Sequence, residues 1–192
     1  MIKRTSVAVI ILLALPFAVR AQAVERGSSH AGSLRFYASI RHVDFRNFTY
    51  RLGTLPPIRV RNGRHRRRND DDFDIDGVEV TYGDLTGDGH DEAIIVVRSS
   101  AGGTGYFSNG FVYTLRRGRP LLLTEFEGGD RAQGGIESAK VKRGILIVER
   151  AGGQGACCPE YVEITEYHWD GARLVQNGAV RRRELLPNDP LS

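Results

Sequence analysis

The stretch that decides the fold is residues 78–97, which read VEVTYGDLTGDGHDEAIIVV. Apolar residues alternate with others over Val78–Tyr82, and Ala93–Val97 is a continuous apolar run. A loop of Gly and Asp separates the two. Alternation with a period of two indicates a β-strand, and two such runs around turn-forming residues indicate a hairpin. This stretch therefore predicts two antiparallel strands.

The same unit recurs along the chain. Turns begin near residues 84, 116, 142 and 170, a spacing of 26 to 32 residues, and apolar or alternating runs flank each turn. The 23 glycines among 192 residues indicate many turns. A further strand is expected over Val43–Tyr50, with a short helix before it, and only Val180–Leu186 has helical spacing. The sequence predicts a mainly β fold, an antiparallel meander of about eight strands built from successive hairpins, arranged as a partial propeller, a sandwich or an open-barrel-like sheet.

The first 23 residues have the pattern of a signal peptide. Lys3 and Arg4 precede a 13-residue apolar run, Val7–Val19, and Ala21-Gln22-Ala23 forms an A-x-A cleavage site. The run is shorter than the roughly 20 residues that span a bilayer, although an uncleaved anchor is the alternative. We expect a secreted or periplasmic protein with no membrane span after cleavage.

The expected organisation follows from these segments. Residues 1–23 are the signal peptide, 24–33 a flexible N-terminus, 34–175 the β domain with a charged loop at 59–76, and 176–192 a polar C-terminal tail.

The charge argues against nucleic acid as a partner. The formal charge of the chain is +4 and its pI is about 9.3. Three basic residues and no acids lie in the signal peptide, so its removal lowers the excess to +1. The arginines of residues 59–68 directly precede the aspartates of residues 69–76, so the charges of the two blocks largely neutralise each other. Such a segment is typical of a solvated insertion between strands.

The loop between the first two strands has the spacing of a metal site. Counted from Asp84, side-chain oxygens fall at positions 1, 3, 5 and 9, a glycine at position 6 permits a sharp turn, and the residue at position 7 can offer its carbonyl. Calcium binds six to eight such oxygens. The predicted Ca²⁺ ligands are Asp84, Thr86, Asp88, His90 and Glu92. The alternative is a hydrogen-bonded turn without a metal, since Asp and Gly favour turns.

Residues 82–96, YGDLTGDGHDEAIIV, resemble the FG-GAP or integrin-α type repeat. That resemblance implies a strand, calcium loop and strand unit of the kind found in β-propellers, with Asp84, Thr86, Asp88 and Glu92 as side-chain ligands and His90 as a backbone ligand. Position 3 holds Thr in place of Asp or Asn, and one copy is evident. The wider pattern, at residues 47–50, 129–132 and 155–159, resembles a small secreted bacterial family to which no activity is attached.

Cys157 and Cys158 are the two cysteines of the chain, and they are adjacent. Neighbouring Cα atoms lie about 3.8 Å apart, closer than in ordinary disulfides, so a bond between them would be strained and easily reduced. Four interpretations of this pair are possible. They are a vicinal disulfide, buried free thiols, a soft-metal site with His168, and redox chemistry or an intermolecular bridge.

No complete catalytic constellation is evident, and the histidines are scattered. The residues that can face a ligand are Asp130, Arg131 and Trp169. The alternatives are a salt bridge or backbone cap within the loop for Asp130 and Arg131, and cross-strand packing for Trp169. The sequence favours a non-enzymatic binding or structural module of the bacterial envelope, with a protein or glycan ligand. The alternative is a periplasmic enzyme, using either Cys157-Cys158 for redox chemistry or the acidic loop for hydrolysis.

Overall fold

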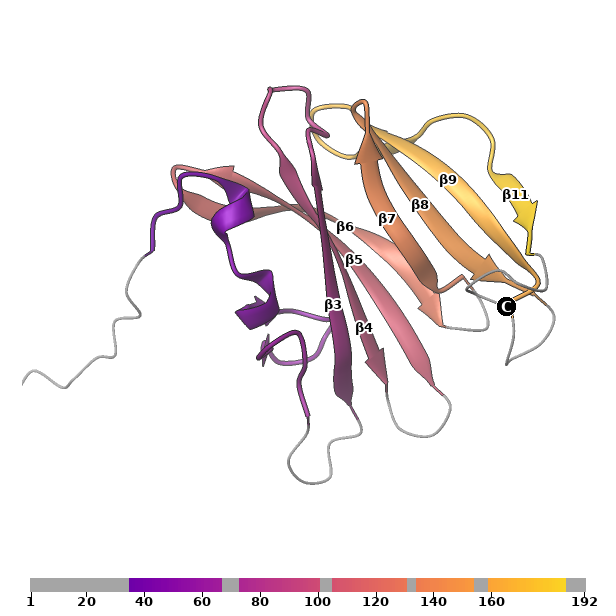
Figure 1. Ribbon diagram of the computed structural model, residues 1–192, viewed down its shortest axis with the longest axis horizontal. Coiled ribbons are helices and arrows are strands. Elements are labelled where there is room, and N and C mark those ends of the chain that lie inside the picture. Colours follow the sequence, from indigo (N-terminus) through magenta and orange to yellow (C-terminus); the bar gives the residue numbers. More distant parts are fainter. Residues whose placement is uncertain (1–34, 67–72, 101–104, 131–133, 154–158, 186–192) are drawn as a thin grey trace, which may run out of the picture. The chain divides into compact units, whose positions relative to one another are not determined.

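Residues 78–97 form a hairpin in which β3 (Asp74–Gly83) pairs antiparallel with β4 (Glu92–Ser100). The computed structural model describes residues 35–66, 73–100, 105–130, 134–153 and 159–185, and the pairing is shown in Figure 1. We call the sheet of order β3-β4-β5-β6 sheet 1 and the sheet of order β10-β9-β8-β7, in which β11 also pairs with β9, sheet 2. The other strands are β1 (Thr49–Tyr50), β2 (Ile58–Arg59), β5 (Tyr106–Arg116), β6 (Arg119–Asp130), β7 (Ile136–Lys142), β8 (Ile145–Gly152), β9 (Tyr161–Trp169), β10 (Leu174–Gln176) and β11 (Arg181–Glu184).

The expected meander of hairpins is confirmed. Arg117-Gly118 joins β5 to β6 and Arg143-Gly144 joins β7 to β8, and all four residues have positive φ. Two-residue turns with positive φ match the right-handed twist of paired strands, which explains why a glycine lies in each. The fold is mainly β, as the sequence predicts.

Strand β4 is buried on both faces. Every residue of Ala93–Val97 is at most 2% exposed. Successive side chains of a strand point to opposite faces. Ala93, Ile95 and Val97 therefore belong to one group of buried side chains, the first core cluster, while Ile94 and Val96 belong to another, the second core cluster. Sheet 1 is therefore covered on both of its faces at β4, which explains the continuous apolar run.

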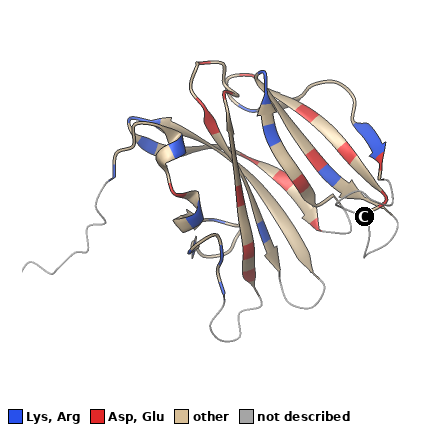
Figure 2. Ribbon diagram, viewed as in Figure 1, with Lys and Arg blue, Asp and Glu red and all other residues tan. Residues whose placement is uncertain are grey.

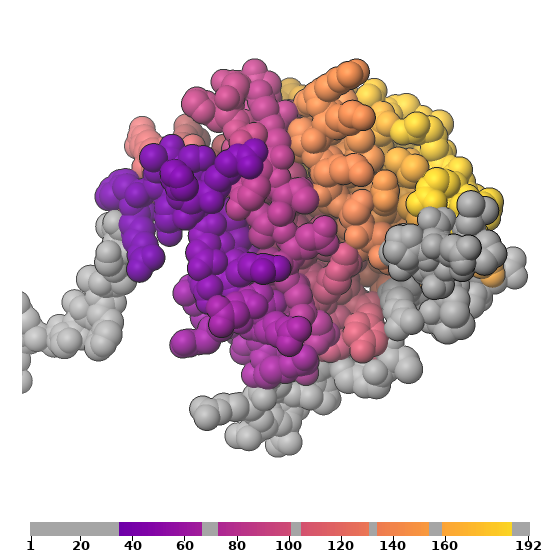
Figure 3. Space-filling model, in the orientation of Figure 1, coloured from indigo at the N-terminus to yellow at the C-terminus, as the bar shows by residue number. Residues whose placement is uncertain are grey.

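Residues 35–65, here called the N-terminal layer, cover one face of sheet 1 (Figure 3). The ring centroids of Phe45 and of Tyr113 in β5 lie 5.4 Å apart, and those of Tyr50 and Phe111 lie 5.6 Å apart. The buried Tyr50 hydroxyl donates to the Phe45 carbonyl at 2.6 Å, so its polar atom is satisfied within the core.

Sheet 2 covers the opposite face of sheet 1, with β7 contacting β3, β4 and β5. Leu146 and Val148 are fully buried there against Ile94 and Val96. A hydrogen bond also joins the two sheets, since Thr81 Oγ1 of β3 donates to the Ala139 carbonyl of β7 at 2.8 Å.

Two local expectations are wrong. Within Val43–Tyr50, Phe45–Asn47 is a 3₁₀-helix, η2, rather than strand, because Asp44 accepts hydrogen bonds from the backbone N–H groups of Arg46 and Asn47. A preceding 3₁₀-helix, η1, spans Ile40–His42. The C-terminal segment with helical spacing contains strand β11 instead, where Arg182 pairs with Glu163 at 3.4 Å and stacks over Tyr161.

The charged segment is partly built into the fold. Val60 is fully buried, and Arg61 bridges to Arg64 across a tight turn. Arg66 contacts Asp74 at 3.1 Å and Asp76 at 2.9 Å, so acids and bases of this segment do face each other. Among the described residues, no helix is long and apolar enough to cross a membrane.

Candidate functional site

The predicted metal loop, residues 84–91, joins β3 to β4 and is closed by its own carboxylates. Asp84 Oδ1 accepts the Gly87 N–H at 2.7 Å, and Asp84 Oδ2 accepts the Gly89 N–H at 3.0 Å. Both glycines have positive φ, 76° and 82°, which suits a residue without a Cβ. Asp84 therefore sets the shape of the loop through hydrogen bonds to the backbone.

Glu92 is fully buried at the start of β4. Its Oε2 accepts the N–H groups of Leu85 at 2.9 Å and Thr86 at 3.1 Å, and its Oε1 accepts the Thr114 hydroxyl at 3.1 Å. Burial raises the pKa of this carboxyl, while the hydrogen bonds from Leu85, Thr86 and Thr114 oppose that shift. Glu92 thus fastens the loop to β5.

The other two acids of the loop, Asp88 and Asp91, do not contact the groups that Asp84 and Glu92 bind. Asp88 Oδ1 accepts the His90 N–H at 2.8 Å, and Asp91 contacts Arg41 of η1 at 2.6 Å. The described residues contain no group of three or more His, Cys, Asp or Glu side chains placed to hold a metal ion. An ionised carboxylate has about four acceptor positions, so the hydrogen bonds of Asp84 and Asp88 leave lone pairs for a cation. Calcium stays a prediction, and the loop has its own means of closure.

The remaining predicted residues are dispersed. Trp169 ends β9, pairs across strands with Leu174 and packs against the second core cluster. Asp130 ends β6 and pairs with Phe107. Arg131, Cys157 and Cys158 lie outside the described residues.

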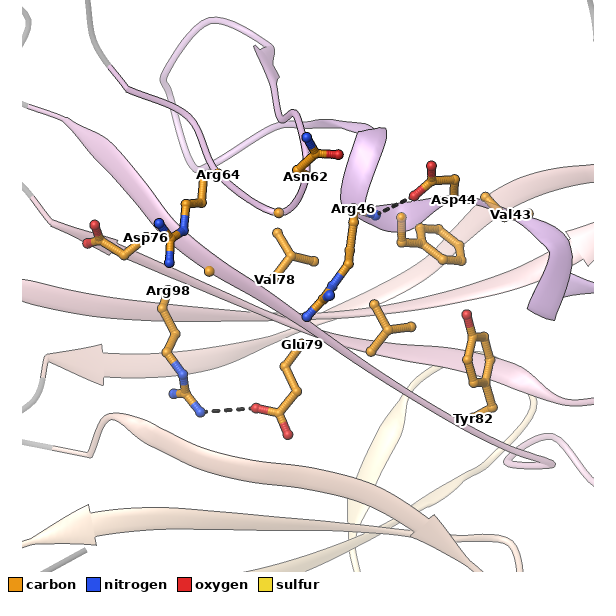
Figure 4. A pocket seen from close by; sticks show the side chains of 14 residues that line it. Val43, Asp44, Arg46, Asn62, Arg64, Asp76, Val78, Glu79, Tyr82 and Arg98 are labelled. Atoms are coloured by element: carbon orange, nitrogen blue, oxygen red, sulfur yellow. Dashed lines mark hydrogen bonds and ion pairs between the residues drawn. The ribbon is translucent and has the colours of Figure 1, made fainter.

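A groove of about 930 Å³ lies over β3, and the sequence alone did not reveal it (Figure 4). We call it the β3 groove. Its residues come from the N-terminal layer, from β3 and from Arg98 of β4. They are Val43, Asp44, Phe45, Arg46, Asn62, Gly63, Arg64, Asp76, Gly77, Val78, Glu79, Val80, Tyr82 and Arg98.

One wall of the groove is a tight turn. Asn62 and Gly63 have φ of 51° and 77°, a backbone conformation that Asn and Gly tolerate best. The turn is docked on η2, because the Asn62 N–H donates to Asn47 Oδ1 at 3.0 Å and the Gly63 N–H donates to the Arg46 carbonyl at 2.7 Å. The Asn-Gly pair was the signal in the sequence for this turn.

The floor contains a β-bulge. The register of β3 against β4 shifts between Ile75 and Gly77, which leaves Asp76 as the extra residue. A bulge bends its strand and redirects a side chain. Asp76 Oδ1 contacts Arg66, whereas Asp76 Oδ2 is buried without a hydrogen-bond partner in the described structure.

Each acid that lines the groove makes at least one polar contact. Asp44 caps η2, Asp76 contacts Arg66, and Glu79 contacts Arg98 at 3.1 Å. Figure 2 shows the acidic positions along β3 and the basic position on β4.

Two arginines of the groove differ from these acids in their contacts. Arg46 and Arg64 are exposed, and within the described part of the chain neither guanidinium has a carboxylate partner. Figure 4 shows Arg46 extending from η2 toward β3. The groove lining thus holds three arginines and three acids, and Arg46 and Arg64 are the two arginines without an ion pair among the described residues.

A second groove of about 640 Å³ lies between β6 and the β9–β10 edge. Its polar groups are more fully engaged, since Arg150 donates to the Glu127 carbonyl at 2.8 Å and Arg173 contacts Asp170 at 3.5 Å. Tyr167 also lines it and packs on the second core cluster.

No family model, curated protein sequence or solved structure matches this chain.

Proposed function

We propose that this protein is an exported, non-enzymatic binding module of the bacterial envelope whose ligand lies in the β3 groove. The observation that carries the proposal is the pair of guanidiniums of Arg46 and Arg64, which line the groove without carboxylate partners among the described residues. Ligand sites are typically concave, with a few polar groups that converge on the ligand. An anionic ligand would supply the negatively charged partners that these two arginines lack.

The backbone around the groove supports this proposal. The Asn62-Gly63 turn is hydrogen-bonded to η2, and β3 pairs along its length with the buried strand β4. The backbone that carries the two arginines is therefore fixed before a ligand binds, and such preorganisation improves affinity. Export is supported by the signal-peptide pattern of residues 1–23.

Calcium has a structural part in the proposal. The loop of residues 84–91 follows directly after β3, so a cation held by Asp84 and Asp88 would stabilise the hairpin that forms the groove floor. Calcium would supply charge neutralisation among these carboxylates.

The test is retention of the purified protein in gels that contain different polymers. The panel holds polygalacturonate, polyphosphate, neutral dextran and cationic polylysine. We expect saturable retention by an anionic polymer, loss of retention in the Arg46→Ala/Arg64→Ala double variant, and an unchanged polymer chain length. A matched double variant, Arg51→Ala/Arg116→Ala, removes the same charge from exposed arginines that do not line the groove. Absence of retention by both anionic polymers, or shortening of the retained polymer, would overturn the proposal.

A further inference from the structure

A patch of exposed basic and apolar side chains lies at the turn between β5 and β6 and shares no residue with the β3 groove. We infer that this patch docks the protein on an anionic lipid surface, a membrane whose headgroups carry phosphate charge. We call it the hairpin patch, and its residues are Phe36, Arg116, Arg117, Arg119, Leu121 and Leu122.

The hairpin patch forms because two segments that are far apart in the sequence meet. The Tyr37 N–H donates to the Gly118 carbonyl at 2.8 Å, which fastens the start of the N-terminal layer to the turn. The Arg119 guanidinium lies over the Phe36 ring, 5.1 Å from its centroid. Phe36 is nevertheless 68% exposed. The fold therefore holds an aromatic ring at the surface, beside arginines, and does not bury it.

The charge of the hairpin patch is positive. Residues 35–43 and 105–124, the two segments that supply it, contain no Asp or Glu. Its three arginines are exposed, and in the part of the chain that the structure describes none of them has a carboxylate partner. Asp91, which reaches the first segment, is paired with Arg41. Figure 2 shows the basic positions at the turn. Each arginine close to an anionic membrane strengthens binding about fivefold, so the patch favours such a surface.

Apolar side chains accompany these charges. Leu121 is 42% exposed and Leu122 is 38% exposed, and both follow Arg119 on β6. Neighbouring residues of a strand point to opposite faces, so this end of the hairpin is apolar on both sides. At a membrane interface such side chains enter the boundary of the acyl chains, while the guanidiniums stay among the headgroups.

The combination of charge and apolar surface distinguishes a lipid surface from a soluble anion. A soluble polyanion would pair with the arginines and leave Phe36, Leu121 and Leu122 in water. Binding at a membrane interface uses both, because buried apolar area and attraction to anionic lipids add to each other. The turn is also fixed before docking, since Arg117 and Gly118 form a two-residue turn with φ of 51° and 71°.

The experiment is cosedimentation of the exported form of the protein with vesicles of phosphatidylcholine alone or mixed with phosphatidylglycerol. We expect binding only when phosphatidylglycerol is present, and weaker binding at high salt. Arg116→Ala/Arg117→Ala should weaken it about twentyfold. The matched control is Lys142→Ala/Arg143→Ala. It removes the same charge just before the glycine of the other two-residue turn, with φ of 53° at Arg143, and should bind as the wild type does.

A second variant separates lipid docking from simple charge attraction. Phe36→Ser/Leu121→Thr keeps every charge, and we expect it to weaken vesicle binding about tenfold. Its control, Leu55→Ser/Val180→Thr, changes two exposed apolar residues outside the patch and should leave binding unchanged. If Phe36→Ser/Leu121→Thr binds as tightly as the wild type, the patch is a surface for any polyanion and the lipid assignment is overturned.

The wild type alone also tests the inference, whatever the variants do to folding. Equal binding to both vesicle compositions, or no binding to either, would overturn it, and the second result would leave the patch to a protein partner. The failure of this inference is distinguishable from that of the proposed function. Arg46→Ala/Arg64→Ala alters the β3 groove and should bind the vesicles as the wild type does. Loss of vesicle binding in that variant would assign the lipid contact to the groove and overturn the inference.

Discussion

Thr114 of β5 donates its hydroxyl to the buried carboxylate of Glu92 on β4, at 3.1 Å. The same carboxylate accepts the N–H groups of Leu85 and Thr86, so one side chain connects the loop after β3 with the third strand of the sheet. This arrangement explains why a charged residue begins the most buried strand of the fold.

Glu92→Ala should be strongly destabilising. It leaves the Leu85 and Thr86 N–H groups and the Thr114 hydroxyl without their acceptor, and each unsatisfied buried group costs about 1–3 kcal/mol, so we expect a loss of about 3 kcal/mol or more. Glu92→Gln keeps one acceptor oxygen and should lose about 1 kcal/mol. Urea unfolding at pH 7 measures both. Equal stability of Glu92→Ala and the wild type would refute this role.

Glu92 should also contribute to the pH dependence of stability. Burial raises its pKa in the folded state above the ordinary 4.5, so the folded protein holds this proton to higher pH than the unfolded chain. Its contribution is complete below about pH 4.5 and is lost as the pH rises through the folded-state pKa. The unfolding free energy of the wild type, minus that of Glu92→Gln, should therefore fall with rising pH in this window. A difference that rises instead would show that the hydrogen bonds outweigh burial.

Arg98 should hold sheet 1 to sheet 2. Its guanidinium donates to the carbonyls of Ile136 at 2.6 Å and Glu137 at 2.9 Å, and it also contacts Glu79. Arg98→Ala should cost about 2 kcal/mol, since hydrogen bonds from charged donors are stronger than neutral ones. Glu79→Gln removes only the half-exposed ion pair and should cost less than about 1 kcal/mol. Chemical denaturation compares the two, and equal losses would assign the effect to the ion pair.

Gly128 marks a close approach of two strands. A Cβ there would lie 2.0 Å from the Ser108 carbonyl oxygen, so the backbone of β5 or β6 would have to move. Gly128→Ala should destabilise the protein by about 1–3 kcal/mol or more. Gly77→Ala is the matched control, because a Cβ at Gly77 meets nothing within 4 Å and its φ is not positive. Thermal unfolding of both variants provides the comparison, and a stable Gly128→Ala would contradict the close approach.

The hairpins were predictable because their signals are local. Arg117-Gly118 and Arg143-Gly144 lie between apolar runs, and the turn type follows from the glycine. The segment around Phe45 was misjudged because β-favouring side chains there compete with the cap that Asp44 provides. The β3 groove was not predictable from one window, since Arg46, Asn62, Asp76 and Arg98 come together only when the N-terminal layer packs on sheet 1.

Calcium should raise the melting temperature if the loop takes the ion. At a free calcium concentration ten times the Kd, binding adds about 1.4 kcal/mol, or about 3–5 °C for a domain of this size. Asp88→Asn keeps an oxygen that can accept the His90 N–H, so its melting temperature in chelator should match that of the wild type. Because the variant lacks the charge that attracts the cation, its calcium-induced shift should be smaller or absent. Equal melting temperatures of the wild type in saturating calcium and in chelator would remove the metal from the proposal and leave Asp84 and Glu92 as the groups that close the loop.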